Sequence, residues 1–475
     1  MSDEPREAAG GFAKFAKRLP SIMLFAGPTL GVLCAWIPQA CGWLERDASL
    51  TLGISVWTAL WWIFEPIPIP VTSLLPLGLL PMAGVLDGKA IAGSYGHSLV
   101  LLLLGGFILS RAMEKSGAHR RIALMMVNGC GGGGGRSVVF GFMLATAVIS
   151  MWISNTATTL MMLPMAIAIL QSSKDNSLRV PLLLGIAFAA NVGGIGTPIG
   201  TPPNLVFMGA YKDLTGTEIS FVQWMKVGVP IAAVMLVVIW LWLTRKLRGS
   251  ATPDLPEVGT WRPEERRTLL VFAITALAWV TRSSPFGGWK TMLEMPMAND
   301  ACVAFIAVIV LFCLPNGEKK GEKLLDWKTA NEIPWGLLLL VGSGLAIGSA
   351  FKASKLSDAV ATLLSGVGSM PTIGLLFCVC ILVTFLTEMT SNTATTNVLM
   401  PILGATAVAS SIDPMLLMLP AALSASCAFM LPVATMPNAV VFGTGEISIS
   451  RMAREGFILN LLGAVAITLV CYFML

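Results

Sequence analysis

Two segments of the chain carry the same run of hydroxyl and amide side chains inside apolar sequence. Residues 153–164 read ISNTATTLMMLP, and residues 390–401 read TSNTATTNVLMP. Ser, Thr and Asn side chains, together with carbonyls at a helix end, supply oxygen ligands that suit a hard cation such as Na⁺. Ser and Asn are also good N-caps, and a helix N-terminus presents free N–H groups to an anion. The repeated run therefore predicts a place where a cation and an anion bind together.

A second pair of segments repeats at almost the same spacing. TPPNLVF (201–207) matches TMPNAVVF (435–442), and LLLLGGFILSRAMEKSG (101–117) resembles LLLLVGSGLAIGSAFKASK (337–355). Proline has no backbone N–H, so the first two of these runs should break the apolar helices that contain them. The side chains of Asn204 and Asn438 could then satisfy the backbone groups that each break frees. Three paired features at nearly one offset indicate an internal duplication.

Basic residues are missing around these motifs. Residues 137–173, 180–211 and 356–450 contain no Lys or Arg. An anion bound there has no basic side chain to neutralise it, so bound cations and helix N-termini must supply the positive charge. Binding of the cation would then be coupled to binding of the anion, because each lowers the electrostatic cost of the other.

One acidic residue, Glu388, lies inside the second SNT segment. A carboxylate within a membrane segment is a functional candidate by default. The corresponding residue of the first repeat is Met151, so Glu388 cannot belong to a symmetric ion site. We therefore expect a structural role, such as capping the hairpin three residues before Ser391.

The composition of the chain identifies it as an all-α polytopic membrane protein. Hydrophobic residues make up 55% of the chain and charged residues 12%, whereas soluble domains carry about 25% charged residues. Apolar segments of about 20 residues are long enough to span a bilayer core. On this basis we predict eleven spans, near 21–40, 51–66, 67–86, 98–116, 181–208, 224–243, 267–284, 299–315, 334–351, 414–445 and 456–474.

The two SNT segments, 137–170 and 371–408, are each too long for one span and have a polar break in the middle. We predict that both are re-entrant helical hairpins, which enter and leave on the same side. With the N-terminus inside, 23 of the 31 Lys and Arg residues then lie on the cytoplasmic side, as the positive-inside rule requires. Five spans separate the two motifs, so the second copy faces the membrane from the opposite side. Inverted-topology repeats of this kind are typical of secondary transporters.

The same features divide the chain into six parts. The repeats occupy 98–208, with a transport core at 137–208, and 334–455, with a transport core at 371–445. The other parts are a cytoplasmic N-terminal segment (1–20), scaffold helices (21–97), scaffold helices with cytoplasmic loops (209–333) and a C-terminal helix (456–475).

Together with WWIFEPIPIPVTSLLPL (61–77) and SCAFMLPVATMPN (426–438), these paired motifs resemble the divalent anion/sodium symporter (DASS) family over essentially the whole chain. The resemblance implies a homodimer in which a transport domain moves as an elevator against a scaffold domain. It also implies carriage of di- or tricarboxylates, or of sulfate, usually with Na⁺ as the co-transported ion. A bacterial inner membrane is the expected location, and neither nucleic acid nor an enzymatic activity is expected. Met436 departs from the family, because many relatives have proline there, and this leaves the choice of anion open.

The resemblance also assigns site residues, position by position. The first sodium site would use Ser150, Ser154 and Asn155 with the backbone oxygen of Gly200. The second would use Thr387, Thr390, Ser391 and Asn392 with the backbone oxygen of Ala434. The substrate carboxylates would contact a third set of residues, in which Asn155 and Asn392 appear again. This set is Asn155, Thr156, Thr201, Pro202, Asn392, Thr393 and Thr435.

Several functions remain open from the sequence. The leading hypothesis is Na⁺-coupled uptake of dicarboxylates such as succinate, malate or fumarate, because both cation pockets keep their hydroxyl and amide side chains. A sodium-independent exchanger or a Na⁺/sulfate symporter could use the same fold. An intramembrane hydrolase would need a base beside Ser154 or Ser391, and the hairpins and broken helices contain neither His nor Lys. A channel is a further alternative, which saturable uptake with counterflow would exclude.

Overall fold

A computed structural model describes residues 4–130, 134–172, 176–247, 259–283, 287–364 and 371–474. Within these ranges the chain forms helices and contains no β-strand, which confirms the all-α prediction. The helices of the first half are α1 (Glu4–Ala40), α2 (Arg46–Phe64), α3 (Ile69–Thr72), α4 (Leu75–Met82), α5 (Gly88–Tyr95), α6 (Ser98–Ser116), α7 (Ala118–Cys130), α8 (Gly135–Ser150), α9 (Asn155–Ser172), α10 (Arg179–Gly193), α11 (Pro202–Thr215) and α12 (Phe221–Thr244), with 3-10 turns η2 (Asn176–Leu178) and η3 (Gly194–Gly196). Those of the second half are α13 (Pro263–Val280), α14 (Gly288–Met292), α15 (Asp300–Cys313), α16 (Trp327–Ala330), α17 (Trp335–Ala353), α18 (Leu356–Leu364), α19 (Thr372–Thr387), α20 (Asn392–Ala409), α21 (Pro414–Ala425), α22 (Met436–Phe442) and α23 (Ile449–Met474).

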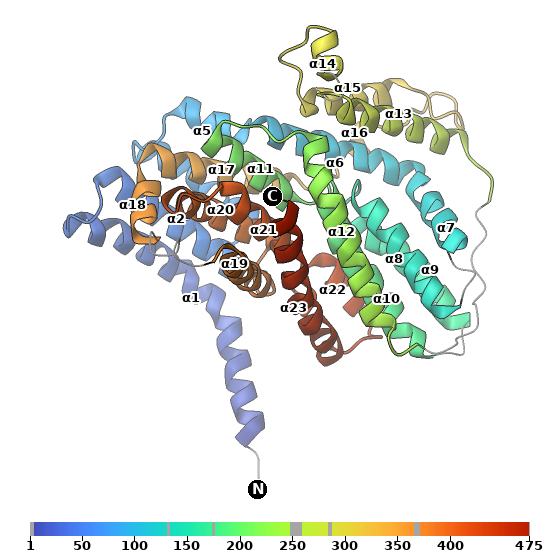
Figure 1. The fold of residues 1–475 in the computed structure, drawn as a ribbon, viewed down its shortest axis with the longest axis horizontal. Helices are drawn as coiled ribbons and strands as arrows, with labels where there is room; N and C mark the ends of the chain where they lie inside the picture. Colours follow the sequence, from blue (N-terminus) through green and yellow to red (C-terminus); the bar gives the residue numbers. More distant parts are fainter. Residues whose placement is uncertain are drawn as a thin grey trace.

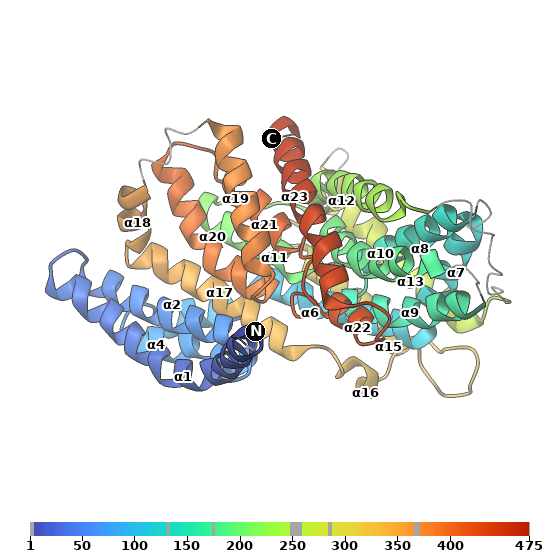
Figure 2. The same cartoon turned by 90° about the horizontal axis from the view of Figure 1, so that it is seen from below.

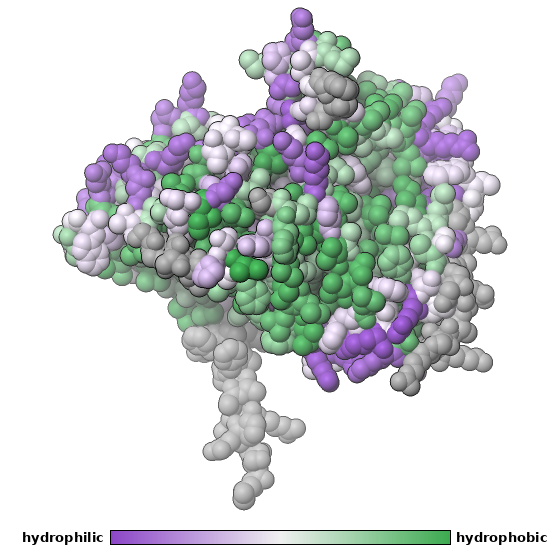
Figure 3. Space-filling view, viewed as in Figure 1, coloured by the Kyte–Doolittle hydropathy of each residue, from purple (hydrophilic) through white to green (hydrophobic). Residues whose placement is uncertain are grey.

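Long apolar helices cover much of the surface. Six helical segments of the described chain are long and apolar enough to cross a membrane, and six shorter apolar helices accompany them. An apolar surface runs over α12 and α23, with hydrophilic residues gathered towards the edges of the molecule (Figure 3). Large apolar side chains such as Leu241 on α12 and Leu469 on α23 are exposed there. Such a wide apolar surface fits contact with lipid rather than with water.

Two features of the predicted threading are wrong in detail. The segment 67–86 is two short helices, α3 and α4, because Pro68, Pro70 and Pro76 remove amide donors that one long helix would need. Short helices also form between the predicted spans, chiefly α7 after α6 and α18 after α17. The sequence prediction left them out because it searched for segments of spanning length, and both are shorter than that.

Both predicted hairpins are present. In the first, α8 and α9 lie side by side and are joined by the four-residue tip 151–154 (Figure 1). In the second, α19 and α20 are joined by the tip 388–391. The second arm of each hairpin begins at the Asn of its SNT run, so the repeated motif forms the turn and the first residue of the helix after it.

Both predicted helix breaks are present as well. The first span divides into α10 and α11, which are separated by η3 and residues 197–201. The second divides into α21 and α22, which are separated by residues 426–435. Pro202 and Pro203 are the first two residues of α11, and Pro437 is the second residue of α22. The first N–H groups of a helix have no partner within the helix, so a proline is tolerated at these positions.

The two repeats interlock through these elements. The first hairpin packs against α10 of its own repeat, and its arm α9 also packs against α22 of the other repeat. The second hairpin packs against α21 of its own repeat, and its arm α20 also packs against α11. Each hairpin thus contacts the first half of its own broken helix and the second half of the other. Figure 2 shows the two hairpins in different parts of the molecule, with α10, α21 and α22 between them.

Candidate ion and substrate site

Three oxygen atoms meet at the tip of the first hairpin. Ser150 Oγ lies 2.7 Å from Asn155 Oδ1 and 2.8 Å from the carbonyl oxygen of Ala190, which belongs to the last turn of α10. The hydroxyl has one hydrogen to donate to two acceptors, so this group is rich in oxygen and poor in hydrogen. Such a group suits a hard cation, and it supports the assignment of Ser150 and Asn155 to the first sodium site.

The second hairpin tip has the same arrangement. Thr387 Oγ1 lies 2.7 Å from Asn392 Oδ1 and 3.0 Å from the carbonyl oxygen of Ala425, the last residue of α21. In both repeats the hydroxyl ends the first arm, the amide begins the second arm, and the carbonyl comes from the end of a half-helix. The duplication seen in the sequence is therefore also a duplication of atomic geometry.

Gly194 allows the first tip to approach the helix break. A Cβ atom added at Gly194 would lie 2.9 Å from Asn155 Oδ1 and 3.2 Å from the carbonyl oxygen of Gly200. The Asn155 side chain and the Gly200 carbonyl therefore lie against the same face of Gly194. This geometry brings the predicted backbone ligand Gly200 close to the first oxygen cluster.

The two Asn residues of the proline motifs brace the breaks, as predicted. Asn204 Nδ2 donates to the carbonyls of Gly194 (2.9 Å) and Thr197 (2.8 Å). Asn438 Nδ2 donates to the carbonyls of Ala428 and Leu431, both at 3.1 Å. The prediction for this pair is confirmed, and in both breaks an Asn side chain donates to two backbone carbonyls.

Glu388 has the structural role expected of it, at a different place. Its carboxylate accepts hydrogen bonds from the backbone amides of Phe429, Met430 and Leu431 at 2.7–2.9 Å, and from Asn460 Nδ2 at 2.8 Å. It therefore caps the amides of the second helix break rather than those of its own hairpin. In the first repeat the Thr197 hydroxyl, which donates to the Met151 carbonyl, joins the tip to the break instead.

Most other residues predicted for the site lie around the tips and breaks without joining an oxygen cluster. Ser154 Oγ accepts from the amide of Ala157 and so caps α9, while Ser391 makes no capping bond with its side chain. The Thr390 hydroxyl lies 2.9 Å from the Leu386 carbonyl and also contacts the Thr395 hydroxyl of α20, so it belongs to a separate group of oxygen atoms. The remaining predicted contacts include buried residues (Thr201, Thr393, Ala434 and Thr435) and half-buried ones (Thr156 and Pro202).

The second proline motif is more open than the first. Met436 is 65% exposed, whereas Pro202, two residues before the bracing Asn of the first repeat, is half-buried. Val433 and Met389 are exposed as well. The departure from the family pattern at position 436 thus places an exposed apolar side chain directly after Thr435.

Sequence reasoning missed the carbonyls of Ala190 and Ala425 and the side chain of Asn191. A backbone carbonyl carries no mark in the sequence, because every residue has one. Asn191 could have been noticed, since it is an amide in an otherwise apolar stretch of α10. Its Nδ2 atom lies 3.0 Å from Thr435 Oγ1, so it joins the first repeat to a predicted substrate contact of the second.

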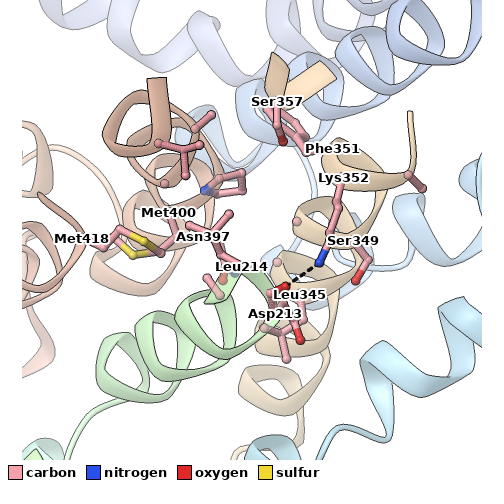
Figure 4. Close-up of a pocket in the computed structure, with 18 of the residues that line it drawn as sticks. Asp213, Leu214, Leu345, Ser349, Phe351, Lys352, Ser357, Asn397, Met400 and Met418 are labelled. Atoms are coloured by element: carbon pink, nitrogen blue, oxygen red, sulfur yellow. Dashed lines mark hydrogen bonds between the residues drawn. The ribbon is translucent and has the colours of Figure 1, made fainter. Parts of the chain in front are cut away.

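A separate cavity of about 620 Å³ lies between α11, α17, α18 and α20 (Figure 4). Its lining is mainly apolar and includes Leu345, Met400 and Met418. At one side Lys352 Nζ donates to the carbonyl of Asp213 at 2.9 Å. None of the residues predicted for ions or substrate lines this cavity, so it marks a packing boundary between the second hairpin and α17.

Comparison with known proteins identifies the family of the chain. A family model described as a citrate transporter matches residues 59–422. The chain belongs to this citrate transporter family. Among its relatives, the sodium-dependent dicarboxylate transporter SdcS of Staphylococcus saprophyticus is 39% identical, covering 95% of this chain and 90% of the relative. SdcS of Staphylococcus aureus is 38% identical, covering 98% of this chain and 94% of the relative.

These relatives confirm the resemblance to the divalent anion/sodium symporters. Solved structures share the fold at low sequence identity. The YdaH transporter of Alcanivorax borkumensis has a TM-score of 0.61 at 15% identity, covering 90% of this chain and 98% of the other. MtrF of Neisseria gonorrhoeae, from a class of antimetabolite efflux pumps, has a TM-score of 0.60 at 13% identity, covering 92% and 97%. With its apolar helices, this member of the citrate transporter family is an integral multi-pass membrane protein.

Proposed function

We propose that the chain is a secondary active transporter that couples inward movement of Na⁺ to uptake of dicarboxylates such as succinate, malate or fumarate. The observation that carries this proposal is the pair of matching oxygen clusters at Ser150–Asn155 and Thr387–Asn392. Each cluster offers a hydroxyl, an amide oxygen and a carbonyl to one Na⁺. The SdcS relatives, named as sodium-dependent dicarboxylate transporters, support the same assignment.

The electrostatics of the site support coupling. The hairpins and broken helices contain no Lys or Arg between residues 137 and 173, 180 and 211, or 356 and 450. A bound dicarboxylate would meet the N-termini of α9, α11 and α20, where partial positive charge gathers. Two Na⁺ ions beside it would supply the rest of the charge, so anion and cations would bind favourably together.

The proposed residue roles follow from position in the two repeats. Sodium would be held by Ser150, Ser154, Asn155 and Gly200 in the first site. Thr387, Thr390, Ser391, Asn392 and Ala434 would hold it in the second. Substrate carboxylates would contact Asn155, Thr156, Thr201 and Pro202 from one repeat, and Asn392, Thr393 and Thr435 from the other.

An asymmetry between the hairpins supports an elevator mechanism. Asn397, on α20, is 1% exposed and donates from Nδ2 to the Leu340 carbonyl of α17 at 2.7 Å. Leu160 has the same position on α9 of the first hairpin and is 54% exposed. Movement of the transport core could exchange the surroundings of the two hairpins. The exposed face of α9 would then become buried, and α20 would lose its contact with α17. We infer that the core alternates between these two arrangements.

The hydrolase and the channel are weaker interpretations. Ser154 Oγ contacts the Ala157 amide, which is not a base, and the relatives are named as transporters. We further propose that the chain forms homodimers in a bacterial inner membrane with its N-terminus in the cytoplasm. Cross-linking of the purified protein in bilayers and labelling of cysteines placed at each terminus would test these two points.

Uptake into proteoliposomes tests the proposed function. Labelled succinate should accumulate when Na⁺ is higher outside, and replacing Na⁺ by K⁺ or choline should abolish accumulation. Excess unlabelled malate or fumarate should compete, whereas sulfate should not. Uptake that ignores the Na⁺ gradient would instead indicate an exchanger, and competition by sulfate alone would indicate a sulfate carrier.

A further inference from the structure

Asn191 reaches from the first repeat into the helix break of the second. It is 1% exposed and follows Ala190, whose carbonyl belongs to the first oxygen cluster. Its Nδ2 atom lies 3.0 Å from Thr435 Oγ1, 3.3 Å from Asn438 Oδ1 and 3.4 Å from the Ala428 carbonyl. Since a backbone carbonyl can only accept, the contact with Ala428 fixes which end of the amide faces the break.

This contact restricts the hydroxyl of Thr435. Thr435 Oγ1 accepts from Asn191 Nδ2 at 3.0 Å and from the backbone amide of Asn438 at 3.3 Å. A hydroxyl has two lone pairs and one hydrogen, so both of its acceptor positions are occupied. In the described part of the chain no acceptor is hydrogen-bonded to that hydrogen. The hydroxyl is therefore left to donate, which is the role needed towards a carboxylate.

The first repeat lacks this brace. Ser426 follows Ala425 as Asn191 follows Ala190, but within the described ranges its Oγ has no hydrogen-bond partner. The amide oxygen of Asn204 also has none, whereas the equivalent atom of Asn438 lies beside Asn191. Thr201 likewise caps α11 without a side-chain hydrogen bond. The two halves of the site therefore differ in how firmly their threonine is oriented.

We propose that Asn191 is a positioning residue that commits the Thr435 hydroxyl to donate to one carboxylate of the transported dicarboxylate. This inference rests on the proposed function and extends it to a residue outside the repeated motifs. It also distinguishes the two carboxylates of the substrate. One of them would accept a hydrogen bond from the Thr435 hydroxyl, which Asn191 orients, whereas the other would meet the first repeat, which has no such oriented hydroxyl. Because Asn191 acts through Thr435, its effect must disappear when Thr435 has no hydroxyl.

A double-mutant cycle on succinate uptake tests this dependence. Asn191→Ala should raise the KM for succinate about tenfold, as loss of one oriented hydrogen bond would, while kcat and the Na⁺ concentration for half-maximal uptake stay close to wild type. Thr435→Val should raise the KM at least as much. The double variant should match Thr435→Val alone. Additive effects, or a change confined to kcat, would overturn the proposal.

Matched variants separate positioning from folding. Ser426→Ala removes a hydroxyl at the corresponding place of the other repeat and should leave the KM unchanged. If Asn191→Ala folds poorly, Asn191→Ser replaces it in the test, because its shorter side chain does not reach Thr435, and it should raise the KM about tenfold. Calorimetric binding of succinate to the purified protein gives a second readout. Wild-type protein that neither transports nor binds succinate would refute the proposed function, while equal affinity of wild type and Asn191→Ser would refute the positioning role alone.

Discussion

Ser150 in α8 and Asn155 in α9 are joined across the first hairpin tip, with Oγ and Oδ1 2.7 Å apart. Thr387 and Asn392 repeat this relationship at the same distance in the second hairpin. In each case a carbonyl from a half-helix completes the group, so neither oxygen cluster can form until a hairpin and a broken helix pack together. The affinity for ions would therefore depend on how the hairpins pack against the broken helices.

The hydroxyl of each cluster should set the affinity for sodium. Thr387→Val keeps the shape of the side chain but removes its oxygen, and it should raise the Na⁺ concentration for half-maximal uptake about tenfold. Thr387→Ser should keep nearly normal Na⁺ dependence. Thr146→Val is a matched control, because the Thr146 hydroxyl donates to the Phe142 carbonyl of its own helix, α8, and not to an atom of either oxygen cluster. An unchanged Na⁺ dependence in Thr387→Val would exclude a cation at this cluster.

The amides of the two SNT runs should be indispensable for transport. Asn155→Ala and Asn392→Ala each remove a proposed sodium ligand and a substrate contact together, so Na⁺-driven succinate uptake should fall to background. Thermal unfolding of the purified variants should remain cooperative, because both residues are half-buried and each substitution removes an acceptor for one neighbouring hydroxyl, that of Ser150 or Thr387. Wild-type uptake by either variant would refute the site assignment.

Asn204 and Asn438, which brace the helix breaks, should contribute mainly to the stability of the fold and less to the affinity for Na⁺. Asn204→Ala leaves the carbonyls of Gly194 and Thr197 without a side-chain donor. Asn438→Ala leaves the Leu431 carbonyl without one, and the Ala428 carbonyl keeps only its longer contact with Asn191 at 3.4 Å. Each variant should lose about 1–3 kcal/mol of stability, the cost of leaving buried acceptors unsatisfied. A lower Tm in lipid nanodiscs measures this loss. A Tm equal to that of wild type in both variants would show that water replaces the amides.

Glu388 should behave as a structural cap rather than as an ion ligand. Glu388→Gln puts an amide nitrogen where a carboxylate oxygen now accepts backbone N–H groups, so the Tm should fall. Glu388→Met introduces the residue found at the first tip, and it should lower the Tm at least as much. The Hill coefficient for Na⁺ should stay at the wild-type value in any variant that still transports. A lower Hill coefficient with an unchanged Tm would contradict this role.

Movement of the second hairpin against α17 can be tested by a cross-link. The side chain of Asn397 lies directly against the Cα atom of Gly344, where a Cβ atom would project, so two cysteines at these positions are close enough to form a disulfide. In Gly344→Cys/Asn397→Cys, oxidation should arrest uptake and a reducing agent should restore it. The two single variants, treated in the same way, control for loss of the contact between Asn397 and Leu340. Full uptake by the cross-linked protein would exclude an elevator movement at this interface.

Much of the architecture could be predicted from the sequence. The SNT runs and the proline motifs are local signals, and each acts on its own backbone: proline removes a donor, and Asn starts a helix or binds a nearby carbonyl. For this reason the hairpins at 137–170 and 371–408, the two breaks and the bracing by Asn204 and Asn438 could be inferred from residue types and spacing. The segment 67–86 shows the limit of hydropathy, since its prolines divide an apolar run into two short helices.

The tertiary structure alone decided which atoms meet. Ala190 and Ala425 contribute carbonyls, and a carbonyl has no sequence signature, so only the packing of each hairpin on its half-helix reveals them. Glu388 caps amides about 40 residues away, and Asn191 contacts Thr435 across 244 positions of the chain. Such partners depend on how the two repeats interlock. Local sequence determined that two breaks and two hairpins exist. Long-range packing determined that these elements build two similar oxygen clusters, and that Thr435 is hydrogen-bonded to a side chain of the other repeat.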